Sequence, residues 1–141
     1  MLSAKIWSSL IDGDRDVTEE EWLDGLRHLS NDQIIQVHFG LQEQIKKHYK
    51  LRADAFHLEK AIELCKQQIA FAQLALPALK AAHDARVSSY ETWIKKPHPF
   101  PEFKAPGHHG YYQYSVILRR QKDFDKLAEI EAKRKLEGWA G

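Results

Sequence analysis

The chain has 141 residues, of which 43% are hydrophobic and 29% are charged, and its formal net charge is +1. This composition is typical of a soluble globular protein and excludes the fibrous and disordered classes. The length suits one domain with its own core, and the balanced charge gives no general attraction to polyanions. The single cysteine, Cys65, excludes an internal disulfide and a cysteine-rich zinc site.

Targeting and membrane segments are not indicated. The N-terminus lacks the basic segment followed by an apolar run that marks an export signal. A membrane-spanning helix needs roughly 18 consecutive apolar residues, and the most apolar window, residues 69–79, is interrupted by Gln73 and Pro77. We therefore expect a cytoplasmic protein with a reduced thiol and no membrane association.

Two capping boxes open the first helices expected along the chain. Thr18–Glu21 and Ser30–Gln33 each place a hydroxyl three residues before a carboxylate or amide, a pattern that satisfies free N–H groups at a helix start. Apolar residues then recur at spacings of three and four over 22–29 and 34–49. Residues 1–32 carry three bases and eight acids, a net charge of −5. This acidic part either docks on the basic remainder or presents a face of opposite sign to partners.

The acidic stretch from Asp12 to Glu21 resembles the second half of an EF-hand loop, in which alternate carboxylates bind Ca²⁺. Leu10 stands where the first aspartate belongs, and Arg15 stands where a glycine allows the sharp turn. We therefore expect a solvated turn that leads into a capped helix.

A third, longer helix is expected after Asp54, whose side chain can cap it, along an apolar stripe that reaches Leu76. Pro77 lacks an N–H and clashes with the preceding turn, so we expect a kink or an end there. A shorter helix is expected from about Ser88 to about Lys95. Residues 96–110 contain four of the five prolines and two of the seven glycines, which predicts a loop or a polyproline-like connector.

Two more helices are expected over 111–118 and 124–130, meeting near Lys122, with Gly138 at the C-terminal stop. Strand patterns are almost absent. We therefore predict a single all-α domain of six or seven helices. It consists of a helical bundle, a loop rich in proline, histidine and aromatic residues, and a C-terminal helical hairpin, over residues 1–95, 96–109 and 110–137.

The turn of the last pair reads Arg120-Gln-Lys-Asp-Phe-Asp-Lys-Leu127, and large, large, small and large residues precede it at Tyr111, Tyr114, Ser115 and Leu118. This pattern resembles a tetratricopeptide repeat, whose two helices meet at a turn of the form K-Q-G-D-Y-D-E-A. Leu127 replaces the usual alanine of the second helix, and a weaker match lies within residues 45–69. The resemblance implies a degenerate hairpin fold that binds other proteins and has no chemistry of its own.

Catalytic motifs are not found in the sequence. There is no nucleophile elbow or glycine-rich phosphate loop, and Cys65 falls on an apolar stripe, where a thiol acts as a small hydrophobe. The adjacent His108 and His109 point in different directions and would need a further ligand such as His98 to hold a metal. We therefore expect no catalytic residue, no cofactor and no metal, and a metal-dependent enzyme is the weakest alternative.

Aromatic residues crowd the segment 90–114, which holds seven of the fifteen in the chain. Exposed rings are favoured as binding anchors because they bury a large area at low entropic cost. We expect Tyr112, His108 and His109 to be exposed, whereas Phe100 and Phe103 either face a partner or fold back and plug the end of the bundle. The predicted protein-binding residues are Trp93, Phe100, Phe103, His108, His109, Tyr111, Tyr112 and Arg120.

The predicted function is that of a small, non-enzymatic protein-interaction module, such as an adaptor, an immunity or inhibitor protein, or a viral accessory protein. The alternative is a nucleic-acid-binding accessory protein that uses basic clusters at 46–52, 119–122 and 133–135. Acidic residues are interleaved with these clusters in the sequence, which favours an ordinary solvated surface.

Overall fold

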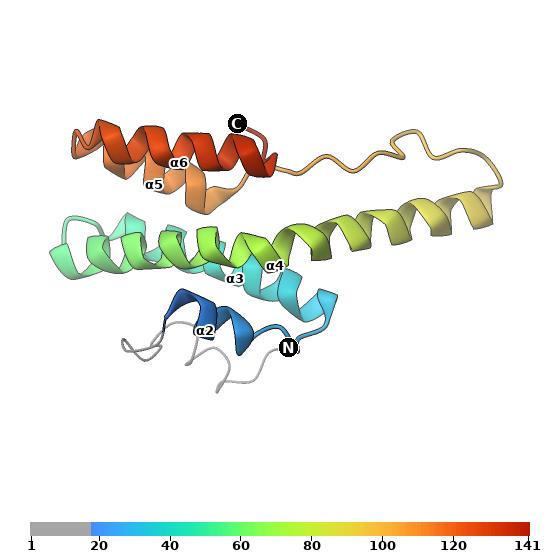
Figure 1. The fold of residues 1–141 in the computed structure, drawn as a ribbon, viewed down its shortest axis with the longest axis horizontal. Helices are drawn as coiled ribbons and strands as arrows, with labels where there is room; N and C mark the ends of the chain where they lie inside the picture. Colours follow the sequence, from blue (N-terminus) through green and yellow to red (C-terminus); the bar gives the residue numbers. More distant parts are fainter. Residues whose placement is uncertain (1–17) are drawn as a thin grey trace.

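Five α-helices make up most of the chain in a computed structural model that describes residues 18–141 (Figure 1). They are α2 (Glu19–Asp24), α3 (Asn31–Lys50), α4 (Ala55–Ile94), α5 (His109–Arg120) and α6 (Phe124–Glu137). The described part contains no strand, only one isolated parallel bridge between Gly107 and Ala140. The predicted all-α class is confirmed in the described residues. Of the acidic stretch from Asp12 to Glu21, residues 12–17 lie outside the described part.

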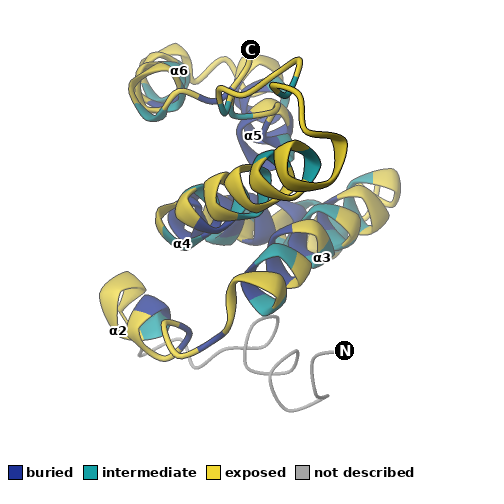
Figure 2. Ribbon diagram, turned by 90° about the vertical axis from the view of Figure 1, so that its right-hand side faces the viewer, coloured by how far each residue is buried: buried dark blue, intermediate teal, exposed yellow. Residues whose placement is uncertain are grey.

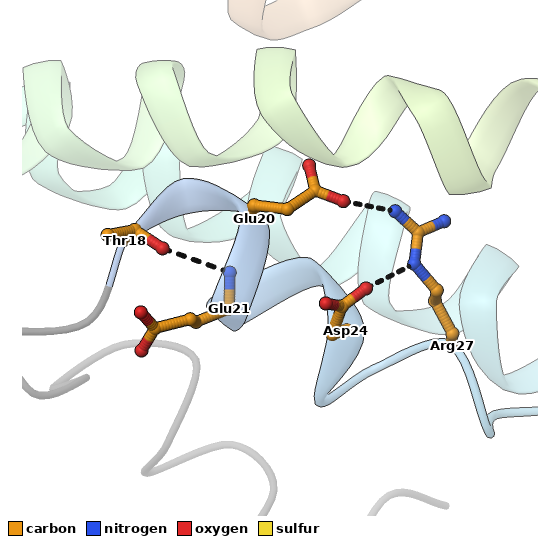
Figure 3. A network of polar contacts seen from close by, with 5 residues as sticks. All are labelled: Thr18, Glu20, Glu21, Asp24 and Arg27. Carbon is orange, nitrogen blue, oxygen red and sulfur yellow. Dashed lines mark hydrogen bonds and ion pairs between the residues drawn. The ribbon is translucent and has the colours of Figure 1, made fainter.

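The short helix α2 begins where the first capping box predicts. The Thr18 hydroxyl accepts a hydrogen bond from the Glu21 amide at 3.2 Å, and the Arg27 guanidinium donates to the carboxylates of Asp24 and Glu20 at 2.7 and 3.0 Å (Figure 3). The helix ends at Asp24, earlier than the expected 22–29, and turns continue the chain to α3.

The long helices α3 and α4 form an antiparallel pair in the centre of the molecule (Figure 1). Ser30 opens α3 with a complete capping box, in which its hydroxyl accepts from the Gln33 amide and the Gln33 side chain accepts from the Ser30 amide. The Asp54 carboxylate opens α4 by accepting from the Phe56 amide at 2.9 Å. The buried side chains of α3 include Ile34, Val37, Leu41 and Ile45.

Helix α4 neither ends nor divides at Pro77 but runs for 40 residues to Ile94. The expected separate helix from Ser88 was therefore wrong, since that segment belongs to α4. Pro77 is exposed, whereas its neighbours Ala75 and Ala78 are buried against the bundle. Packing on the inner face therefore outweighs the local cost of the proline. Beyond Ala78 no residue of α4 is buried, and the helix projects from the bundle (Figure 1).

Helices α5 and α6 form a hairpin at the C-terminal end, and α4 lies between this hairpin and α3 (Figures 1 and 2). Lys122 adopts a left-handed conformation (φ 59°) in the turn, and the Asp123 carboxylate caps α6. Gly138, at φ 91°, ends α6 where the sequence predicted a stop. All five helices and Trp139 contribute buried side chains to one continuous core.

Candidate functional site

The C-terminal part of α4 and the connector that follows it form a projection from the bundle, residues 79–107, which we call the finger (Figure 1). Lys95 ends α4 in a left-handed conformation (φ 61°), which allows the chain to reverse direction. The connector then runs back along α4 to the bundle, where the carbonyl of Pro106 accepts a hydrogen bond from the Ala140 amide at 3.1 Å. The finger is thus anchored at its base by the segment that follows α6.

Ring contacts hold the connector against α4. The His98 ring lies edge-on to Tyr90, with centroids 4.9 Å apart, and the Phe103 ring lies 5.8 Å from that of His83. The His98 amide also donates to the Glu91 carboxylate at 3.0 Å. These contacts bury part of each ring and give the connector a defined path along the helix.

The end of the finger carries large apolar side chains that nothing in the described chain covers. Trp93 is 81% exposed, Phe100 is 74% exposed and Ile94 is 50% exposed; we call these three residues the tip patch. Lys95 and Lys96 lie between them in the sequence, and residues 92–101 contain no acid. Single exposed apolar residues are ordinary, but three within eight positions of the sequence form a candidate binding surface.

The other predicted binding residues lie elsewhere. Phe103 is half-buried along the finger, so of the predicted residues within the finger only Trp93 and Phe100 are strongly exposed. Tyr112 is 65% exposed on α5, as expected, and Arg120 is exposed at the end of that helix. The idea that Phe100 plugs the bundle is wrong, because its side chain is 74% exposed.

Two residues predicted to bind a partner are sealed in the core. Tyr111 is fully buried and His108 is 3% exposed, so the expected exposure of His108 was wrong. The His108 ring caps α5, since its Nδ1 accepts from the Tyr111 amide at 3.1 Å, while its Nε2 donates to the main-chain carbonyl of Gln68 at 3.1 Å. His109 is half-buried, with its ring 6.0 Å from that of Tyr112.

His108 belongs to a buried group of polar and aromatic side chains that joins three helices. The indole of Trp139 lies edge-on to His108 at 4.8 Å and stacks on His38 of α3. The Gln68 side-chain amide donates to the main-chain carbonyl of His38 at 2.9 Å. Burial lowers the pKa of His108 to about 3 and that of His38 to about 4, so both rings are neutral near pH 7. Sequence reasoning missed this group because its members are distant in the chain.

Groups suited to catalysis do not converge in the described part of the chain. Burial raises the pKa of the Cys65 thiol to about 12, which removes it as a nucleophile near pH 7. His48 and His57 share one hydrogen bond, with their Nδ1 atoms 2.9 Å apart. Across residues 18–141 no three histidine, cysteine or acidic side chains gather as metal ligands, and no helix has the length and apolarity needed to cross a membrane.

The basic clusters lie on separate elements and partly serve the fold. Arg134 donates to the Trp139 carbonyl at 2.9 Å and to the Glu131 carboxylate at 3.2 Å, so it holds the C-terminal segment in place. A shallow groove on the last turns of α3 is lined by Glu43, Lys46, Lys47, Lys50 and Leu51. Because Lys46 lies 3.7 Å from the Glu43 carboxylate, an acid is part of this basic surface.

Comparisons of this chain with family models, curated proteins and solved structures find no match. The tetratricopeptide likeness of the C-terminal hairpin therefore stays a prediction from its residues.

Proposed function

We propose that this protein is a non-enzymatic interaction module that binds a partner protein through the tip patch of the finger. The observation that carries the proposal is the exposure of Trp93 and Phe100, 81% and 74%, at the end of a projection. Tryptophan and other large rings dominate the binding energy of protein interfaces when a partner pocket desolvates them. Other exposed apolar residues lie away from the tip, such as Phe56 at the opposite end of α4 and Leu136 on α6.

The finger is suited to this role because its shape is fixed before binding. The contacts of His98 with Tyr90 and Glu91 hold the connector to α4, and three prolines, at 97, 99 and 101, restrict the backbone of the tip. A surface that is already ordered loses less conformational entropy on association. A larger share of the free energy gained by burying the two rings therefore appears as affinity.

The test is capture of partners from the native cell, followed by measurement with the purified captured protein. The double variant Trp93→Ala/Phe100→Ala is compared with wild type and with a control, Phe56→Ala/Leu136→Ala. The control removes two large apolar side chains that are similarly exposed but lie away from the tip. We expect the tip variant to bind at least about 30-fold more weakly, since each anchor contributes on the order of 1–2 kcal/mol or more. The control variant should bind like wild type.

Two outcomes would overturn the proposal. The first is a tip variant that retains the affinity of wild type for every captured protein. The second is tip-dependent binding to vesicles of anionic phospholipid without any tip-dependent protein partner, because Lys95 and Lys96 beside Trp93 also suit a lipid surface. Binding to nucleic acid that weakens steeply with salt and ignores the tip variant would favour the basic clusters instead.

A further inference from the structure

His108 is the point at which the C-terminal hairpin joins the rest of the molecule. It is the N-cap of α5 through Nδ1, it bonds to α4 through Nε2, and it lies under the indole of Trp139. Gly110 brings the hairpin so close to α4 that a Cβ at this position would lie 2.8 Å from the Gln68 side-chain oxygen. We call His108 with its bonds to Tyr111 and Gln68 the His108 junction.

The junction requires one protonation state. A neutral ring with its proton on Nε2 can donate to the Gln68 carbonyl and accept from the Tyr111 amide at the same time. The imidazolium ion has no acceptor, so its Nδ1–H would face the Tyr111 N–H, donor against donor. Protonation therefore removes the cap of α5 and places a charge in the core.

The groups that face His108 compensate this charge only in part. Burial is the main cause that lowers the pKa of His108 to about 3, and His38 from α3 and His109 from α5 lower it further. The hydrogen bond to the Gln68 carbonyl favours the charged ring but offsets only part of this effect. Glu137 of α6 is already engaged, because its Oε1 accepts from the Tyr111 hydroxyl at 2.8 Å and from the Trp139 indole at 3.0 Å. Uptake of a proton thus favours any state in which the ring reaches water.

We propose that proton uptake by His108 below about pH 6 raises the population of an open state in which the C-terminal hairpin and Trp139 have left α4 as one unit, while α2, α3 and α4 remain folded. The hairpin has its own internal bonds, from Ser115 to Glu131 at 2.9 Å and from Arg134 to the Trp139 carbonyl. The pair α3 and α4 keeps its own buried stripe after the hairpin leaves. Because the Ala140 amide bonds to Pro106, release of the hairpin also frees the base of the finger.

The test is amide hydrogen exchange of the full chain at pH 7.5 and pH 5, corrected for the intrinsic pH dependence of exchange. The amides of residues 109–137 should report an opening equilibrium of the hairpin that is at least about 30-fold larger at pH 5 than at pH 7.5. This is the factor expected for a ring that titrates near 6.5 once it is released. Peptides from 55–78 should keep their protection. Equal loss of protection in both regions would show global unfolding and overturn the proposal.

A variant separates His108 from the other histidines. In His108→Asn the amide can still cap α5 but does not titrate in this range, so the pH-dependent increase in hairpin opening should shrink by about 30-fold relative to wild type. His28→Asn, at an exposed site, should behave as wild type. An undiminished increase in His108→Asn would overturn the proposal. These measurements need no partner, so they stand apart from the test of the tip patch.

Discussion

Trp139 stacks on His38 with their ring centroids 5.8 Å apart and their planes within 9° of parallel. The segment after α6 thereby closes the core against α3, although the two residues lie 101 positions apart in the chain. The indole N–H donates to Glu137 and the Trp139 carbonyl accepts from Arg134, so the ring is fixed on both sides. The docking of the C-terminal hairpin on the rest of the bundle therefore depends on a few residues that follow the last helix.

Replacing Trp139 by alanine should lower the free energy of unfolding by about 3–5 kcal/mol, the usual cost of deleting a fully packed large ring. The side chain is 2% exposed. Urea unfolding at pH 7 measures the change. Leu136→Ala is the control, because Leu136 is 89% exposed and its loss should cost less than about 0.5 kcal/mol. Similar values for the two variants would contradict the described packing.

Gly110→Ala should destabilise the protein by about 1–3 kcal/mol, since the added methyl would meet the Gln68 side chain at 2.8 Å and the Cys65 carbonyl at 3.2 Å. The matched control is Gly107→Ala, where the new Cβ has no neighbour within 4 Å. Thermal unfolding of the two variants side by side is the measurement. If the control loses as much stability as Gly110→Ala, the close approach of α5 to α4 is wrong.

The parts of this fold that sequence reasoning predicted are those set by neighbours in the chain. The caps at Thr18, Ser30 and Asp54 each depend on residues no more than three positions away, and all three begin a helix. Gly138 ends α6 for the same local reason, because it accepts a left-handed conformation without strain.

The errors concern residues whose state is decided by distant partners. The helix does not end at Pro77, and the residues next to it in the sequence do not reveal that Ala75 and Ala78 are buried against the bundle. In the sequence, His108 and His109 belong to a segment that reads as a polar loop. In the structure, Gln68 and Trp139 pack against the His108 ring and bury it. The burial of Phe103 but not Phe100 likewise follows from the position of His83 on α4.

Pro77→Ala should stabilise the protein, because alanine restores a main-chain donor four residues after Gln73 and removes the ring clash inside α4. Proline costs about 3 kcal/mol relative to alanine in a helix interior. We expect a gain of about 1–3 kcal/mol, since the unfolded chain also becomes more flexible. Urea unfolding tests this, with Gln73→Ala, also at an exposed position, expected to change stability by less than about 0.5 kcal/mol. A loss of stability in Pro77→Ala would mean that the bundle needs the proline geometry.

The stability of the whole protein should fall in acid because of His38 as well as His108. The pKa of His38 is lowered from 6.5 to about 4 by burial, so the unfolded chain binds more protons than the folded one between these values. The stabilisation is complete above pH 6.5 and is lost as the pH falls toward 4. By pH 5 the loss for this one ring is about 2 kcal/mol.

His38→Phe isolates this contribution, because phenylalanine keeps a flat ring against Trp139 and cannot take up a proton. The decrease in the free energy of unfolding from pH 7 to pH 5, measured in urea, should be smaller than in wild type by about 2 kcal/mol. Phenylalanine is the larger ring, so the variant can be less stable at both pH values. That packing cost cancels when the free energies of unfolding at pH 7 and pH 5 are subtracted. If stability falls between these pH values by as much in the variant as in wild type, His38 is not held neutral in the folded protein.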